Sequence, residues 1–264
     1  MDESFLSQPL VIEASRDFIC IRLTTYENQS EHEFMEQLYG RTNRPVENTT
    51  FTILSPDTRT IYVRPNRSPD FTYRHPDQMA AQMFQIAKKH GGSKNGNPSS
   101  LPTAANVKIG INIAASDKLP LIVVLGKDKV QQSDLESRLN SVAWRESIAG
   151  KFTFVSSRDR AELKPIDGVE KNFESGYLVV QPGSFGLDGK VIKRVDSNIE
   201  LEALVDALTS SLGLYETPAT VSHRAHIQNG VKAGVFWETN LPVTDRMEAN
   251  ARSRTKSMIE RNKK

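Results

Sequence analysis

The stretch GGSKNGNPSSLP at 91–102 divides the chain into two parts. Small, turn-forming residues replace the periodic apolar residues found on either side of it, which is typical of an interdomain linker. The chain has 264 residues, of which 38% are hydrophobic, so each part can bury a core of its own. The sequence therefore predicts a domain at 1–90, a linker at 91–105, a second domain at 106–215 and a C-terminal extension, partly helical and basic, at 216–264.

The first part predicts the order strand, helix, strand, strand, helix. The run DFICIRLT at 17–24 is apolar and β-branched, as in a strand covered on both faces. After a helix, strands at 50–54 and 59–63 form a hairpin about a Pro-Asp turn. The last helix ends at Gly91. Its buried face is expected to contain Met79, Met83, Phe84 and Ala87.

The second part ends in the same strand, strand, helix order. It begins with a buried strand, PLIVVL at 120–125, and a helix capped by Ser133 with Glu136. A helix capped by Ser197 with Glu200 and ending at Gly213 closes this part. Between the two helices, strands are expected at 151–155, 177–181 and 190–195.

These patterns resemble the thioredoxin-like superfamily. The opening MDESFLSQPLVIEASRDFICIRLTTYEN is similar to the stretch that follows the CxxC motif in that family, and TTFTILSPDTRTIYV resembles its hairpin. The region from near Val107 to near Leu214 resembles a fuller copy. The resemblance implies an α/β fold with two thioredoxin-like domains, each a mixed sheet flanked by helices, the first incomplete at its N-terminus.

Neither copy contains the redox centre of the family. The loop after PLIVVL, where the family has its dithiol, reads GKDKVQQS. The cis-proline that precedes the hairpin in the family is missing before both hairpins of this chain. The single cysteine, Cys20, lies between two isoleucines and is expected to be a buried, structural thiol. We therefore expect no catalytic residues and no cofactor.

Three explanations account for the missing start of the first domain. The true start lies upstream of Met1, the second domain covers the exposed sheet edge, or the tail around VFWETNL at 235–241 completes the sheet. In the first case the chain is part of a thiol-disulfide oxidoreductase whose CxxC precedes Met1. Otherwise the chain acts as a non-catalytic interaction or scaffold module.

The candidate partner-binding residues follow from the resemblance. Lys127, Asp128 and Lys129 stand in the loop where the family has its dithiol, and Gly176 with Tyr177 begins the hairpin beside it. Two lysines near a helix N-terminus favour an acidic partner, such as a protein, and the alternative interpretation is a solvated loop whose charges serve only solubility. The formal charge of +2 is no signal for nucleic acid, and no apolar run is long enough to span a membrane.

Three other patterns receive simpler interpretations. His223 and His226 are spaced as HxxH but are interpreted as a surface pair, so no metal site is expected. The glycines at 183, 186 and 189 precede a strand and fit a hairpin loop better than a phosphate loop. The N-terminus lacks a secretory signal, which indicates a cytoplasmic protein as given, or a periplasmic or secreted one if the start lies upstream.

Overall fold

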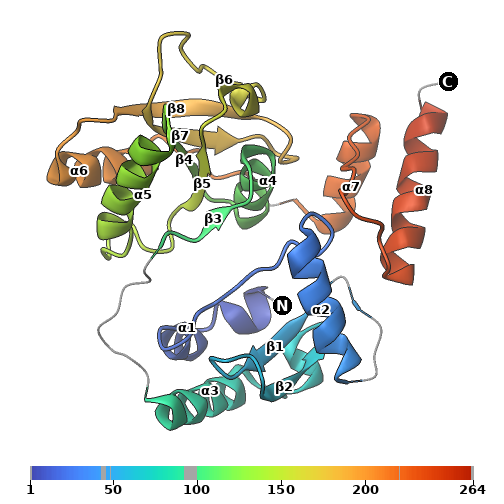
Figure 1. Ribbon diagram of the computed structural model, residues 1–264. Helices are drawn as coiled ribbons and strands as arrows, with labels where there is room; N and C mark the ends of the chain where they lie inside the picture. Colours follow the sequence, from blue (N-terminus) through green and yellow to red (C-terminus); the bar gives the residue numbers. More distant parts are fainter. Residues whose placement is uncertain (1, 43–45, 48, 92–99, 220, 263–264) are drawn as a thin grey trace. The chain divides into compact units, whose positions relative to one another are not determined.

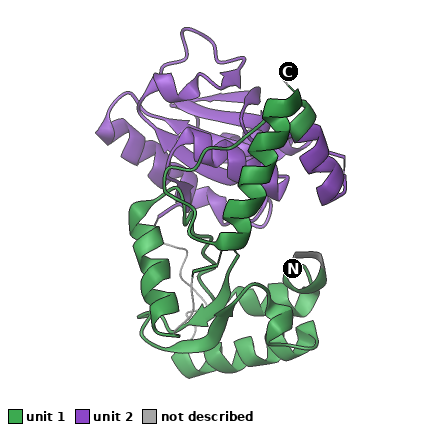
Figure 2. Ribbon diagram, turned by 90° about the vertical axis from the view of Figure 1, so that its right-hand side faces the viewer, with its two compact units in different colours: residues 1–96, 231–264 green, residues 97–230 purple. Residues whose placement is uncertain are grey.

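The computed structural model describes residues 2–42, 46–47, 49–91, 100–219 and 221–262 (Figure 1). These residues form two compact units, and Figure 2 colours them separately. Unit 1 comprises 1–96 together with 231–264, and unit 2 comprises 97–230. Among the described residues, no helix combines the length and the apolar character needed to cross a bilayer.

The centre of unit 2 is a six-stranded mixed sheet in the order β3-β5-β4-β7-β8-β6. Strand β4 runs parallel to β5, which runs parallel to β3, whereas β7 is antiparallel to both β4 and β8. The short β6 pairs with β8 in parallel. The strands are β3 (Thr103–Ala104), β4 (Leu121–Leu125), β5 (Thr153–Ser157), β6 (Ile166–Asp167), β7 (Gly176–Pro182) and β8 (Gly189–Asp196).

Helices cover both faces of this sheet, which explains why β4 is apolar throughout. Ile122 and Val124 join a core cluster with α5 (Lys129–Ala143) and α6 (Leu201–Leu212). Their neighbours Leu121 and Val123 join a second cluster with α4 (Val107–Asp117). Because successive side chains of a strand point to opposite faces, a strand between two layers needs apolar residues at every position.

The strands and helices predicted for the second part are confirmed, with shifted boundaries. Helix α5 begins four residues before Ser133, because Asp128 is its N-cap. Helix α6 begins at Leu201, and Glu200 makes no side-chain capping bond. Most of the predicted linker, 92–99, lies outside the described residues, while Thr103–Ala104 pairs with β5 and belongs to the sheet.

Unit 1 contains a small antiparallel sheet of β1 and β2 packed against helices α1 and α3. The predicted hairpin and the helix that ends at Gly91 are confirmed. Helix α7 (His223–Lys232) spans the division between the units. The remaining elements are η1 (Asp2–Leu6), α1 (Pro9–Ser15), α2 (Gln29–Gly40), β1 (Phe51–Leu54), β2 (Ile61–Asn66), η2 (Pro69–Phe71), α3 (Pro76–His90) and α8 (Arg246–Asn262), with η3 (Arg160–Leu163) in unit 2.

The predicted buried strand at 17–24 is wrong. The stretch begins with a turn and a bend and forms no strand, Cys20 is exposed, and Ile19 and Ile21 are 87% and 73% exposed. A strand needs a neighbour for its backbone groups, and in the described part of unit 1 β1 and β2 pair only with each other. Phe84, predicted in the core, is 38% exposed. The coarser prediction of an α/β fold with a mixed sheet flanked by helices is confirmed.

Candidate binding site at the carboxyl ends of the central strands

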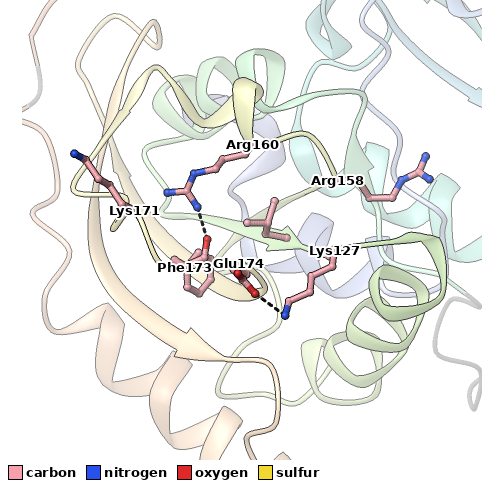
Figure 3. Close-up of a pocket in the computed structure, with 8 residues that line it drawn as sticks. Lys127, Arg158, Arg160, Lys171, Phe173 and Glu174 are labelled. Carbon is pink, nitrogen blue, oxygen red and sulfur yellow. Dashed lines mark hydrogen bonds and ion pairs between the residues drawn. The ribbon is translucent and has the colours of Figure 1, made fainter.

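The parallel strands β4 and β5 end side by side, and a hollow of about 450 Å³ lies beyond them. β4 leads into the turn 126–128 and then into α5, whereas β5 leads into the segment 158–160. The carboxyl ends of neighbouring parallel strands are a common place for binding sites in α/β sheets. The hollow is lined by Leu125, Gly126, Lys127, Arg158, Arg160, Lys171, Phe173 and Glu174 (Figure 3).

The turn from β4 into α5 is tightly built. The carboxylate of Asp128 accepts hydrogen bonds of 2.9 Å from the backbone N–H groups of Val130 and Gln131, so it caps the helix. Gly126 is required beside it, because a Cβ there would lie 2.6 Å from the Cβ of Gln132. The N-terminal N–H groups that Asp128 caps are therefore already satisfied.

Two of the cations around the hollow are held by neighbouring groups. The Lys127 ammonium lies 2.6 Å from the Glu174 carboxylate, and this hydrogen bond and charge lower the pKa of Glu174. Arg160 donates to the carbonyl of Phe173 (Figure 3). It also donates to the carbonyl of Glu170 at 2.6 Å. Arg160 thus holds the segment before β7 against the end of β5.

The other two cations, Arg158 and Lys171, are exposed at opposite sides of the hollow with their charged ends directed outward (Figure 3). In the part of the chain that the structure describes, neither has an ion-pair partner. The lining therefore contains four cationic side chains and one carboxylate. An acidic group that approaches this edge of the sheet meets more positive than negative charge.

A second hollow of about 340 Å³ shares Arg158 with the first. Its wall includes Ser156, whose hydroxyl is buried and has no hydrogen-bond partner among the residues that the structure describes. The adjoining Ser157 hydroxyl accepts a 3.0 Å bond from the backbone N–H of Asp159, which shapes the start of the 158–160 segment. The two hollows together extend the polar surface around Arg158.

The structure separates the predicted binding residues into two groups. Lys127 lines the first hollow, Asp128 caps α5, and Lys129 is exposed at the first position of that helix. Gly176 and Tyr177 are buried in β7 instead.

The two buried residues have structural partners. The Tyr177 hydroxyl donates to the Leu135 carbonyl at 3.0 Å, and burial raises its pKa to about 12. They support the site from inside without lining the hollow. Arg158, Arg160 and Lys171 were not among the residues predicted from the sequence, although Arg158 and Arg160 come soon after the predicted strand at 151–155, which forms β5 beside β4.

The other sequence patterns lie elsewhere. His223 and His226 are in α7, where the His226 ring lies 5.2 Å from the ring of Phe185. Among the described residues, no three His, Cys, Asp or Glu side chains are grouped as metal ligands would be. Gly183 and Gly186 lie in the β7–β8 connection and Gly189 begins β8, which confirms a hairpin loop. Exposed Cys20 belongs to unit 1, and partial desolvation raises the pKa of its thiol.

Comparison with known proteins finds no matching family model, no matching curated protein and no matching solved structure.

Proposed function

We propose that unit 2 is a thioredoxin-like module without a redox centre, which binds an acidic segment of another protein at the hollow beside Lys127. The fold part of this proposal is supported by the order β3-α4-β4-α5-β5, followed by the hairpin β7–β8 and helix α6. Three parallel strands next to an antiparallel hairpin are similar to the arrangement of the thioredoxin fold. We do not extend the proposal to unit 1, whose described sheet has two strands.

The proposed lack of redox chemistry rests on the residues of the turn after β4. That turn contains Gly126, Lys127 and Asp128, and the single cysteine of the chain belongs to unit 1. Dithiol exchange requires a thiolate that attacks and a second thiol that resolves the mixed disulfide. The chain is therefore expected not to accelerate the reduction of insulin by dithiothreitol. Precipitation of the insulin B chain above the rate without protein would refute this part.

The proposed partner follows from the charges around the hollow, which is the observation that carries the proposal. Lys127 is within reach of a carboxylate, as its contact with Glu174 shows, and Arg158 and Lys171 extend positive charge to either side. Exposed ion pairs are individually weak and screened by salt. Binding is therefore expected to be modest in affinity, faster at low ionic strength and selective for acidic segments.

A fluorescein-labelled glutamate-rich peptide tests this partner by fluorescence anisotropy. Lys171→Glu is expected to weaken binding by about fivefold to tenfold, because it reverses one rim charge. Lys151→Glu is the control, because it makes the same change of net charge. Lys151 is exposed and precedes β5, whereas the hollow lies beyond the carboxyl end of that strand, so binding is expected to stay unchanged. Equal effects of the two substitutions, or equal binding of a lysine-rich peptide, would contradict a site at this hollow.

A further inference from the structure

The C-terminal part of unit 1 returns to the turn that precedes α2. The backbone N–H of Leu241 donates to the carbonyl of Tyr26 at 2.9 Å, and the side-chain amide of Asn240 donates to the carbonyl of Glu27 at 3.2 Å. The donor and acceptor residues of both bonds belong to unit 1, although more than 200 residues separate them in sequence. The tail forms no strand in its described residues 233–245, so it does not complete the sheet.

The carboxylate of Glu27 contacts two groups of the tail. One oxygen accepts a 2.7 Å hydrogen bond from the indole N–H of Trp237, and the other accepts a 3.3 Å bond from the backbone N–H of Asn240. The ring of Trp237 is half-buried at this contact. Hydrogen bonds to an ionised acceptor are stronger than bonds between neutral groups, so Glu27 is a specific anchor for the indole.

A second anchor lies eight residues further along the tail, at Asp245. Its side chain is 3% exposed, and its carboxylate lies 2.7 Å from the guanidinium of Arg67. The backbone N–H of Asp245 donates to the Tyr26 hydroxyl at 3.2 Å. The other carboxylate oxygen caps α8 by accepting from the N–H of Met247 at 2.8 Å. A buried charge of this kind is stable only while its partner stays in place.

Side chains of helix α8 contact residues 236–238 of the tail. Arg252 donates to the carbonyl of Trp237, and its guanidinium lies 4.8 Å from the centre of the Phe236 ring. Lys256 lies 5.6 Å from the same ring and 3.1 Å from the Glu238 carboxylate. These contacts hold residues 236–238 against α8, and ordering them in advance lowers the entropic cost of their binding.

We propose that Tyr26, Glu27 and Arg67 form a peptide-recognition site in unit 1, and that the chain's own segment 236–245 is its occupant. The site recognises three features of a peptide: an indole N–H, backbone groups that follow it, and a carboxylate eight residues after the tryptophan. The segment acts as a strap that closes the site in cis. This proposal lies in unit 1 and is independent of the binding proposed for unit 2.

The first test follows the strap in the full-length chain. The chain has two tryptophans, so a Trp144→Phe background leaves Trp237 as the single tryptophan, whose emission is excited selectively over that of the tyrosines. Glu27→Ala removes two hydrogen bonds to the strap and is expected to raise the open population at least about tenfold, seen as stronger quenching by acrylamide. Glu33→Ala removes another carboxylate of unit 1, which contacts Gln29 and no strap residue, and should leave quenching unchanged. Unchanged quenching in Glu27→Ala would overturn the proposal.

The second test supplies the strap in trans as a fluorescein-labelled peptide of residues 235–246. Trp237→Ala weakens the strap but leaves the site intact, so this full-length variant should bind the peptide at least about tenfold more tightly than the wild-type chain, whose tethered strap competes at millimolar effective concentration. Adding Glu27→Ala to Trp237→Ala should remove that gain. Equal binding to the single and double variants would overturn the proposal, and circular dichroism of each variant checks that it is folded.

Discussion

Gly176 has a structural role that the sequence pattern did not indicate. The sequence placed it at the partner-binding face together with Tyr177, but both are buried in β7. Gly176 has a φ of +132°, and a Cβ at this position would lie 2.3 Å from the carbonyl oxygen of Val195. Its role is to let β7 and β8 approach each other, because only glycine has no side chain to clash there.

Gly176→Ala is therefore expected to lower the free energy of unfolding of unit 2 by about 2–4 kcal/mol, from backbone strain and the clash with β8. Urea denaturation followed by circular dichroism measures the change. Gly213→Ala is the matched control, because its φ is −73° and a Cβ there would meet only the Ser210 carbonyl oxygen, at 3.5 Å. Equal stability of Gly176→Ala and the wild-type chain would contradict this account.

At the scale of elements, the start of α5 depends on Asp128, although the sequence pattern favoured Ser133. Both residue types cap helices well, but the cap is decided by where the backbone leaves the extended conformation. Asp128 has φ −144° and ψ 178°, and its side chain receives two backbone N–H groups. Ser133 is inside the helix, one turn later.

Asp128→Ala is expected to destabilise unit 2 by about 1 kcal/mol through loss of the N-cap. The exposed Asp134 lies within the same helix, so Asp134→Ala removes the same charge without removing a cap. Thermal denaturation of both variants separates the two effects. If Asp134→Ala lowers the stability of unit 2 as much as Asp128→Ala does, the effect comes from the lost charge and not from the lost cap.

The β1–β2 turn supplies a prediction about pH. The Ser55 hydroxyl donates to the Asp57 carboxylate at 2.5 Å, and this bond, followed by the backbone N–H of Arg59, lowers the pKa of Asp57. A carboxyl whose pKa is lowered by folding stabilises the hairpin above its ordinary pKa, and this contribution is lost as the pH falls through the lowered value. Ser55→Ala is expected to raise the pKa of Asp57 toward its ordinary value of about 3.9. An NMR titration of the Asp57 carboxyl carbon checks the shift, and an unchanged pKa would refute the assigned cause.

At the scale of the whole molecule, each unit has separate hydrophobic clusters. The two large clusters of unit 2 include Ile122 and Val123 respectively, whereas the clusters of unit 1 include Met83 and Leu38. Each cluster consists of residues from one unit. The chain passes between the units twice, because unit 1 contains both the N-terminal region and the tail.

Two calorimetric transitions are therefore expected for the full-length chain. Val123→Ala should lower the midpoint of one transition by the equivalent of about 2 kcal/mol, and Met83→Ala should lower the other by a similar amount, because each creates a cavity in one core. Differential scanning calorimetry measures both midpoints. A single transition that both substitutions shift equally would contradict independent cores.

Much of the fold was predictable from local sequence patterns. The uninterrupted apolar run of β4, the Pro-Asp turn of the first hairpin and the glycine after α3 each act through neighbouring residues, so their elements were predicted with errors mainly at their boundaries. The positions of Lys127 and Asp128 after β4 were predictable for the same reason. These features depend on backbone preferences and side-chain periodicity, which adjacent residues carry.

The remaining features depend on groups that are distant in sequence. The run at 17–24 has the composition of a strand, but the described part of unit 1 offers its backbone no neighbouring strand. Arg158 and Lys171 join the hollow only because β5 lies beside β4 and Phe173 packs near their ends. The indole of Trp237 donates a hydrogen bond to Glu27, which lies 210 positions earlier in the sequence. Strand pairing, burial and ion pairing between such groups are properties of the tertiary structure, because each needs a partner that local sequence does not contain.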